Sequence, residues 1–478
     1  MKVHHGLARG DRRGVPNCRF RAVWALCESK AEVNIMKRRD FLTRASIVAG
    51  SSMLSMATAA QVAMAGSAQA GTLTAGAAGA LSSADWVGLR KLFELSPNFV
   101  HLATFLLSSH PRPVAEAIER HRRAFDLNPV EHYYANVGEM DQTIANAAAE
   151  YIGGKAEQIA MTDSTTMGLA MVASGLVLRP DDEILQSEHD HYAMDLSLQL
   201  RAERTGARVR RVALYDEPAD ASVDEMLSRL KAAISPSTKV VAMTWVHSLS
   251  GVKLPIRAIG DMLAELNGAR ADTDQILFLV DGVHGFGIED VDVSNLGCDF
   301  FVAGTHKWIF GPRGTGLIWG SDRGWAHCKA VVPSFGQSYG VWLGYLTQDQ
   351  VPAGDHMTPG GFHAFDHRWA LPEAFKLHLQ LGKANVQKRI HELNAFAKEG
   401  LKEIEGVTLH TPMSSELSSG MICFDYKDMQ PWPVAGALYE KGIIASATPY
   451  RRSYARFAPS LINDEEEIER ALAALASL

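Results

Sequence analysis

The stretch Gly304–Gly316 constrains this chain most strongly. It reads Gly-Thr-His-Lys-Trp-Ile-Phe-Gly-Pro-Arg-Gly-Thr-Gly and places Lys307 shortly after the apolar run Phe300–Ala303. Such a run predicts a buried strand, and an ammonium group at its end is costly to desolvate. A lysine is tolerated there when its amine is consumed chemically, as when it holds an aldehyde as a Schiff base. The alternative is an ordinary lysine on a solvated loop.

A second apolar run ends in a carboxylate. Ile276–Val280 is followed by Asp281 and then by Gly-Val-His-Gly, which includes His284. Ligands of open α/β sheets bind at the carboxyl ends of strands, and an aspartate facing a pyridine nitrogen keeps that nitrogen protonated. The combination of Asp281 and Lys307, each following its own strand, resembles the class V aminotransferase-like family of pyridoxal-phosphate (PLP) enzymes.

The resemblance implies an α/β protein of PLP fold type I. Its large domain would hold a mostly parallel, seven-stranded-type sheet covered by helices, followed by a smaller α/β C-terminal domain. The alternation of helical and strand patterns from about Glu116 onward independently indicates a parallel sheet covered by helices. The implied cofactor is pyridoxal 5'-phosphate, bound to the catalytic Lys307, with Asp281, His284 and His306 among its contacts.

A polar turn after the strand predicted at Gln158–Met161 is a candidate anion site. The turn contains Thr165 and Thr166 and leads into a helix predicted over Met167–Leu178. Backbone amides and hydroxyl groups at a helix N-terminus bind phosphate, although the same residues also serve as plain N-caps. In the family this turn cradles the PLP phosphate, so the resemblance assigns Thr165 and Thr166 to it, together with His306.

Two further strand ends carry candidate cofactor contacts. The strand predicted at Glu183–Gln186 leads to Asp-His-Tyr-Ala, in which the resemblance implies that His191 stacks on the pyridine ring, with Tyr192 as the second candidate. The strand predicted at Val240–Trp245 leads to Ser248, at the position from which family members approach the cofactor's 3-oxygen. No further ligands accompany the histidines near residue 190, so no metal site is expected.

The C-terminal third of the chain predicts a second α/β unit with a candidate substrate contact. Its predicted elements are helices over His367–Leu381 and Asn385–Ile404 and strands near Gly406–Leu409 and Gly420–Asp425. The family closes with Arg-x-Ser-x-x-x-Tyr-Asn, whose arginine grips the substrate carboxylate. Arg456 and Asn463 match this pattern, whereas Ala458 and Ile462 replace the serine and the tyrosine. The alternative for Arg456 is an unpaired surface arginine.

The N-terminal region contains the features of an export signal. Lys37–Leu42 resembles a twin-arginine motif, Ala45–Ala65 is a mild apolar segment, and Ala68-Gln69-Ala70 offers a cleavage site. The segment is too weakly hydrophobic for a stable membrane anchor, and a basic N-terminal helix is the alternative. We therefore predict a periplasmic or otherwise exported protein that uses the twin-arginine translocase.

The chain divides into six predicted segments. Translation starts at Met1 or at Met36, and the sequence alone leaves both open. The segments are a disordered or untranslated extension (1–35), the twin-arginine signal peptide (36–70), a linker (71–84), the N-terminal segment of the small domain (85–125), the PLP-binding large domain (126–345) and the small C-terminal domain (346–478).

The overall composition narrows the partners of the protein. A formal net charge of −7 over 478 residues shows no basic excess, so nucleic acid is not an expected partner. Cys298, Cys328 and Cys423 follow the predicted signal at spacings that fit neither a metal site nor a disulfide framework.

Residues 333–363 are rich in glycine, aromatic residues and histidine, as are the family loops that reach across a dimer interface. We therefore expect a homodimer with shared active sites.

The type of reaction is less constrained than the cofactor. Within class V the chain resembles the isopenicillin N epimerase-like branch through His101–Pro129 and through the tryptophan that follows Lys307. The periplasmic PLP enzyme of pyoverdine maturation belongs to the same branch. Cysteine desulfurases carry a nucleophilic cysteine on the loop before the terminal arginine, and Gly442–Arg451 contains none.

We expect an aminotransferase-like or epimerase-like enzyme that acts at the α-carbon of an amino acid or of an amino-acid-containing metabolite. The alternatives are a periplasmic tailoring enzyme for siderophores of the pyoverdine type, a C–S lyase, and a non-catalytic PLP-fold binding protein. Transamination, epimerisation, elimination and oxidative decarboxylation all remain open, as does the choice between a free and a peptide-linked substrate.

Overall fold

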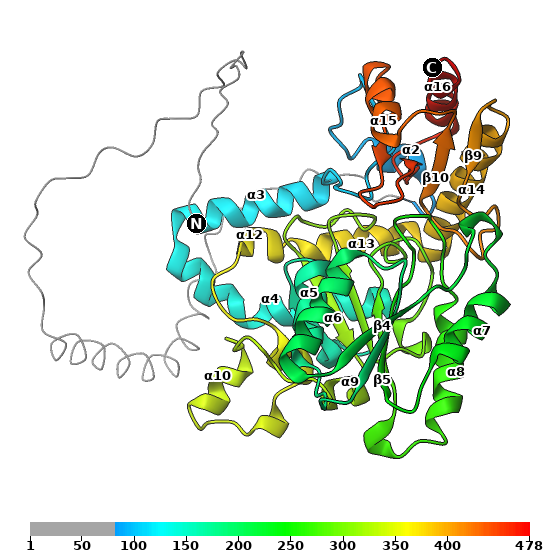
Figure 1. Cartoon of the computed structure of the whole chain (residues 1–478). Coiled ribbons are helices and arrows are strands. Elements are labelled where there is room, and N and C mark those ends of the chain that lie inside the picture. The colour runs from blue at the N-terminus through cyan, green and yellow to red at the C-terminus, as the bar shows by residue number, and fades with distance from the viewer. Residues whose placement is uncertain (1–81) are drawn as a thin grey trace, which may run out of the picture. The chain divides into compact units, whose positions relative to one another are not determined.

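The computed structural model describes residues 82–478 (Figure 1). The predicted extension, the export signal and residues 71–81 of the predicted linker lie outside the described residues, so these assignments stay predictions. Within residues 82–478, no helix is both long enough and apolar enough to cross a membrane.

A seven-stranded sheet forms the centre of the molecule, in the order β2-β8-β7-β6-β5-β3-β4. Strand β8 runs antiparallel to both of its neighbours, and all other neighbouring strands are parallel. The predicted mostly parallel sheet and the predicted fold class are confirmed. The strands are β2 (Ile159–Thr162), β3 (Glu183–Ser187), β4 (Arg208–Val212), β5 (Thr238–Thr244), β6 (Leu277–Asp281), β7 (Phe300–Gly304) and β8 (Gly316–Gly320).

Helices cover both faces of this sheet, because alternate strand residues point to opposite sides. Val240, Leu279 and Val302 pack in one buried cluster with the apolar side chains of α5 and α6. Val241 and Val280 pack in another cluster with those of α4, α7, α8 and α13. These helices are α4 (Pro129–Ile152), α5 (Thr165–Gly175), α6 (Tyr192–Thr205), α7 (Val223–Ala233), α8 (Ile256–Asn267) and α13 (Leu371–Leu381).

A smaller four-stranded antiparallel sheet lies in the C-terminal part, in the order β12-β13-β10-β9. Helices α14, α15 and α16 gather around it (Figure 1). Strand β1 pairs in parallel with β11 and so joins the N-terminal segment to this part. The elements are β1 (Val100–His101), β9 (Val407–Leu409), β10 (Ile422–Tyr426), β11 (Ile443–Ile444), β12 (Ser446–Ala447), β13 (Ala455–Phe457), α14 (Lys383–Lys402), α15 (Pro431–Glu440) and α16 (Glu465–Ala476).

The remaining helices are short apart from α3, and one of the short ones, α11, contacts β2 of the large sheet although it lies in the predicted segment 346–478. The predicted domain boundaries stay predictions. The remaining helices are α2 (Trp86–Arg90), α3 (Arg112–Leu127), α9 (Asp322–Ala326), α10 (Gln337–Trp342), α11 (Ala353–Met357), α12 (Phe365–Arg368) and the 3₁₀ turns η1 (Ala156–Gln158), η2 (Pro218–Asp220), η3 (Asp272–Asp274), η4 (Val293–Asn295) and η5 (Gln348–Gln350).

One predicted helix is wrong as a single element. The segment predicted as a helix over His367–Leu381 is divided between α12, which ends at Arg368, and α13, which begins at Leu371. Pro372 lies in the first turn of α13. It has no N–H for a bond to the carbonyl of Arg368, and its ring would clash with that carbonyl. A continuous helix through this position is therefore unfavourable.

Candidate active site

The carboxyl ends of five parallel strands bring the predicted cofactor residues to one edge of the large sheet. Asp281 is the last residue of β6, and Lys307 follows β7, its neighbour. His191 and Ser248 follow β3 and β5, and Thr165 follows β2. Thr165 and Asp281 thus lie at the same edge, although they are 116 positions apart in the sequence.

Lys307 is half-buried and Asp281 is buried, and the charge of each shifts the pKa of the other. Burial lowers the pKa of the Lys307 amine, the Asp281 charge opposes this shift, and the Arg456 charge adds to it. Burial raises the pKa of Asp281, whereas the backbone N–H of Val283, which donates to its carboxylate at 3.2 Å, and the Lys307 charge lower it. A lowered lysine pKa increases the neutral amine, which is the form that attacks a carbonyl group and accepts a proton.

The N-terminus of α5 faces the start of the Lys307 loop. The Ser164 hydroxyl caps the helix by accepting from the backbone N–H of Met167 at 3.2 Å. Thr165 Oγ1 accepts from the backbone N–H of Gly304 at 2.8 Å, and Thr166 is exposed in the first turn. The plain N-cap is therefore Ser164, which leaves Thr165, Thr166 and the first-turn amides as the candidate anion contacts.

Arg456 reaches the same edge from the small sheet. It is 4% exposed, its Nε donates to Ser446 Oγ at 3.1 Å, and its Nη1 donates to the carbonyl of Ser248 at 2.6 Å. The ring centre of Phe105 lies 4.1 Å from the guanidinium carbon. The second N–H of Nη1 and the N–H groups of Nη2 can each donate to one of the two oxygens of a substrate carboxylate. The alternative of an unpaired surface arginine is wrong, because Arg456 is buried and hydrogen-bonded.

The histidines of the site are held in neutral form. Burial first, and then the Lys307 charge, lower the pKa values of His191 and His306 to about 4. His284 is buried, and its Nδ1 accepts from Trp308 Nε1 at 3.4 Å. His191 is half-buried, whereas the neighbouring Tyr192 is exposed. This difference favours His191 over Tyr192 as the residue that faces a cofactor ring.

The family model "Aminotransferase class-V" matches residues 108–450, which contain all of the predicted site except Arg456. The chain belongs to this family. As a class V aminotransferase-family member it is a PLP-dependent enzyme of the transferase, isomerase or lyase type, with the α/β architecture of PLP fold type I.

Relatives of this class V member bear the names of enzymes with different reactions. The isopenicillin N epimerase of Streptomyces clavuligerus is 27% identical over 412 residues, which cover 83% of this chain and 99% of that protein. A probable cysteine desulfurase of Halalkalibacterium halodurans is 28% identical over 359 residues, 73% of this chain and 82% of that protein. The solved structure of the cystine C–S lyase C-DES with cysteine persulfide has a TM-score of 0.71 at 21% identity and covers 80% of this chain and 98% of its own.

The residues present fit the phosphate of PLP. The Nδ1 atom of His306 is buried and meets no hydrogen-bond partner within the described part of the chain. Gly304 leaves the gap beside it open, because a Cβ atom there would lie 3.0 Å from both His306 Cε1 and Thr165 Oγ1. An unpartnered ring nitrogen, a hydroxyl group and a helix N-terminus around one gap are the groups that a phosphate ester requires.

Three residues at this edge were not among those predicted from the sequence. Ser108 holds the Lys307 loop, since its N–H and its hydroxyl both donate to the carbonyl of His306, at 3.1 and 2.9 Å. Phe105 covers Arg456, and the Tyr450 hydroxyl lies 2.6 Å from Ser248 Oγ. No local motif surrounds these residues, so the sequence gives no signal for their contacts.

A buried polar network lies behind His191. Asp190 accepts from the backbone N–H groups of Ser187 and Thr244, at 3.0 and 2.8 Å, and so ties the ends of β3 and β5 together. His247 Nε2 lies 3.7 Å from Asp190, and its Nδ1 lies 2.7 Å from the Tyr215 hydroxyl. Burial raises the pKa of Asp190 to about 7, although both backbone N–H groups oppose the shift. This network fixes the backbone from which His191 and Ser248 project.

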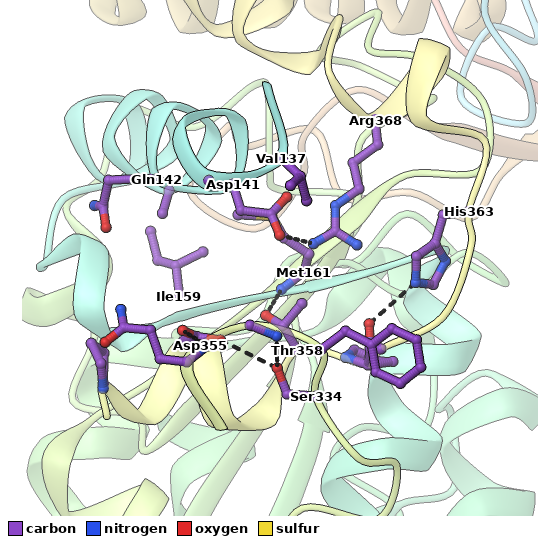
Figure 2. A pocket seen from close by; sticks show the side chains of 18 of the residues that line it. Val137, Asp141, Gln142, Ile159, Met161, Ser334, Asp355, Thr358, His363 and Arg368 are labelled. Carbon is purple, nitrogen blue, oxygen red and sulfur yellow. Dashed lines mark hydrogen bonds and ion pairs between the residues drawn. The ribbon is translucent and has the colours of Figure 1, made fainter. Parts of the chain in front are cut away.

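A separate pocket of about 420 Å³ lies between α4, β2 and the segment 334–368 (Figure 2). Arg368 and Asp141 form an ion pair across it at 3.0 Å, and Thr358 Oγ1 accepts from the backbone N–H of Met161 at 3.0 Å. None of the predicted cofactor residues lines this pocket. Its wall includes Gly360 and Gly361 of the segment that we predicted to approach a partner subunit.

Two further features of the described residues bear on the site, namely the arrangement of possible metal ligands and the state of the cysteines. Residues 82–478 contain no cluster of histidine, cysteine and acidic side chains that could hold a metal ion. Cys298, Cys328 and Cys423 are buried and free. Burial raises the pKa values of Cys328 and Cys423 to about 12, so both are thiols at neutral pH and poor nucleophiles.

Proposed function

We propose that the enzyme acts at the α-carbon of an amino acid or of an amino-acid-containing metabolite, in the manner of an aminotransferase or an epimerase. The observation that carries this proposal is the half-buried amine of Lys307, at the sheet edge that also holds Asp281 and receives Arg456, both of whose charges shift its pKa. A nucleophilic amine, a carboxylate and a carboxylate-binding fork at one edge are what α-carbon chemistry on an amino acid needs.

Each residue has a defined role in this proposal. Lys307 Nζ is the attachment point of PLP, and as a neutral amine it takes the α-proton of the substrate and returns it. Asp281 would keep the pyridine nitrogen of bound PLP protonated, and His191 would pack on its ring. When bound, PLP supplies an electron sink for the electron pair left at the α-carbon. The phosphate is held by Thr165, Thr166, His306 and the N-terminus of α5.

Arg456 provides the test of substrate class. If its fork binds a free α-carboxylate, Arg456→Ala should lose about 2–4 kcal/mol of binding or transition-state energy, and Arg456→Lys should recover only part of it. The measurement is a titration of the cofactor absorbance with free amino acids. Arg452→Ala is the control, because Arg452 is an exposed arginine of the loop that precedes β13, 3.7 Å from Glu217. Equal apparent affinities in wild type and Arg456→Ala would refute the role and point to a peptide-linked substrate.

A persulfide-forming desulfurase is the least supported reaction among those of the relatives. It requires a thiolate near the substrate, and Gly442–Arg451 contains no cysteine. Cys423 pairs with Arg456 across two strands but is fully buried. The C–S lyase alternative needs no such thiol and is supported by the fold likeness to C-DES. The non-catalytic alternative is disfavoured by the intact Lys307 and Asp281.

We further propose export through the twin-arginine pathway and action as a homodimer in the periplasm. The support for export is Arg38-Arg39 and Ala68-Gln69-Ala70, and a translocase that carries folded proteins suits an enzyme that acquires PLP before export. A periplasmic location in turn supports siderophore tailoring of the pyoverdine type as the second candidate function. Arg38→Lys with Arg39→Lys should retain the precursor in the cytoplasm, and unchanged periplasmic recovery would contradict export.

A further inference from the structure

Tyr450 connects the small sheet to a residue of the cofactor edge. It lies in the loop between β12 and β13, and its hydroxyl oxygen is 2.6 Å from Ser248 Oγ. The carbonyl of Ser248 also accepts the 2.6 Å bond from Arg456 Nη1. Ser248 therefore receives two short contacts from the C-terminal part of the chain, 202 and 208 positions away in the sequence.

The Tyr450 phenol is a hydrogen-bond donor under ordinary conditions. Burial raises its pKa to about 12, while the Ser248 hydrogen bond and the Arg456 charge oppose the shift. The other charged groups that act on it are Asp281 and Asp190, which raise the pKa. Its ring meets the His191 ring edge to face, with centres 6.3 Å apart. The phenol thus lies between His191, expected on the ring face, and Ser248, expected at the 3-oxygen.

The direction of the Tyr450–Ser248 bond determines where the Ser248 proton points. A serine hydroxyl has one proton and two lone pairs. If Tyr450 donates to Ser248 Oγ, the serine proton is free to be donated to a ligand. A hydroxyl that accepts one hydrogen bond also becomes a stronger donor of the next.

We propose that Tyr450 is a positioning residue that acts through Ser248. Its hydroxyl donates to Ser248 Oγ and directs the Ser248 proton to the phenolic 3-oxygen of PLP. The inference rests on the proposed function, which requires bound PLP, and on the family resemblance, which implies that the 3-oxygen lies beside Ser248. In consequence, the loop that precedes Arg456 would adjust the basicity of the nitrogen through which Lys307 would hold the cofactor.

The test is a spectrophotometric pH titration of the lysine-bound cofactor in the purified holoenzyme without substrate. A hydrogen bond to the 3-oxygen stabilises its negative charge and weakens its hold on the proton of the neighbouring nitrogen. Tyr450→Phe should therefore raise the titration midpoint by roughly half a pH unit. Ser248→Ala should raise it at least as much, and the double variant no further than Ser248→Ala alone.

Tyr454→Phe is the matched control in the same loop. Its hydroxyl is buried and meets no hydrogen-bond partner among residues 82–478, while its ring stacks on His410 at 4.0 Å. The control should titrate like wild type. An unchanged midpoint in Tyr450→Phe, or a Tyr450→Phe shift that persists in the Ser248→Ala background, would overturn the inference alone. Absence of a lysine-bound chromophore in wild type would overturn the proposed function as well.

Discussion

At the residue scale, we expect Asp281 to contribute to turnover and not to the stability of the fold. Asp281→Asn keeps the shape of the side chain and removes a buried charge, which is costly to bury. We expect the apoprotein to keep its stability and the holoenzyme to keep PLP on Lys307. Turnover should fall about a hundredfold or more, because one preorganised electrostatic contact to the cofactor ring is lost.

Thermal unfolding, absorbance of the bound cofactor and turnover, measured together, check this prediction. Wild-type turnover in Asp281→Asn would show that the carboxylate does not face the cofactor. A strong loss of apoprotein stability would instead indicate that Asp281 is a folding residue.

Residues in local motifs could be predicted, and residues that act across the fold could not. Lys307, Asp281 and Thr165 each follow a recognisable strand, so their position at the sheet edge follows from the parallel topology. Tyr450 contacts Ser248 across 202 positions, and Ser108 contacts His306 across 198. Such contacts depend on how the C-terminal and N-terminal segments pack, for which one sequence carries no periodic signal.

At the element scale, a buried ionic cluster around Glu289 joins α14 to the region after β6. The Glu289 carboxylate accepts from Lys253 Nζ at 2.8 Å and from Ser419 Oγ at 2.6 Å, and it lies 2.9 Å from His391 Nε2 of α14. Burial acts to raise the pKa of Glu289, but the His391 hydrogen bond and the Lys253 charge prevail and lower it. The cluster is therefore a charged contact between α14, which packs against the small sheet, and the segment that follows β6 of the large sheet.

Glu289→Ala should lower the free energy of unfolding by about 3 kcal/mol, because it leaves Lys253 buried without its partner. Asp290→Ala is the control: its carboxylate lies 3.5 Å from Lys383 Nζ with 40% of the side chain exposed, and such pairs contribute about 0–1 kcal/mol. Urea denaturation of the two variants measures the difference. Equal destabilisation would contradict a specific role of the cluster.

Most elements of the large sheet were predictable to within a few residues, because buried parallel strands are short apolar runs. The ends of helices were less predictable. The helix predicted over Met167–Leu178 is α5, which begins at Thr165 and ends at Gly175. Leu176 instead forms a bridge with Cys328, a contact 152 positions away in the sequence. Tertiary pairing of this kind ends a helix without a local stop signal.

At the scale of the whole molecule, histidines that are wholly or partly buried should make the fold sensitive to acid. Burial lowers the pKa of each below its unfolded value of about 6.5. The unfolded chain then binds more protons below that pH, and stability falls as the pH decreases from about 6.5 toward about 4. Asp190, whose pKa burial raises, opposes this trend. The histidines are His110, His121, His132, His189, His191, His247, His284, His306 and His378.

His378→Phe tests this trend at one fully buried position. Burial lowers the pKa of His378 to about 3, so its protonation in the unfolded chain costs about 2 kcal/mol of stability between pH 7 and pH 5. Urea denaturation at both pH values should show a smaller acid-induced loss in His378→Phe than in wild type. An equal loss in the two proteins would contradict the contribution of this histidine.

Lys307 is the residue that we propose carries PLP, and Lys398 provides the sharpest comparison. Burial lowers the pKa of Lys398 to about 8, so this lysine also has an activated amine by that criterion. Its Nζ, however, donates to the carbonyls of Pro412 and Met413 and to Ser418 Oγ, at 2.8, 2.9 and 2.7 Å. Three hydrogen bonds from one ammonium group use all of its protons, which marks Lys398 as a structural cation.

The most direct measurement is borohydride reduction of the purified holoenzyme followed by peptide mapping by mass spectrometry. We predict a pyridoxyl group on the peptide that contains Lys307, and loss of both the label and the reducible chromophore in Lys307→Ala. A label on Lys398 or on another lysine, or a chromophore that survives in Lys307→Ala, would contradict this prediction.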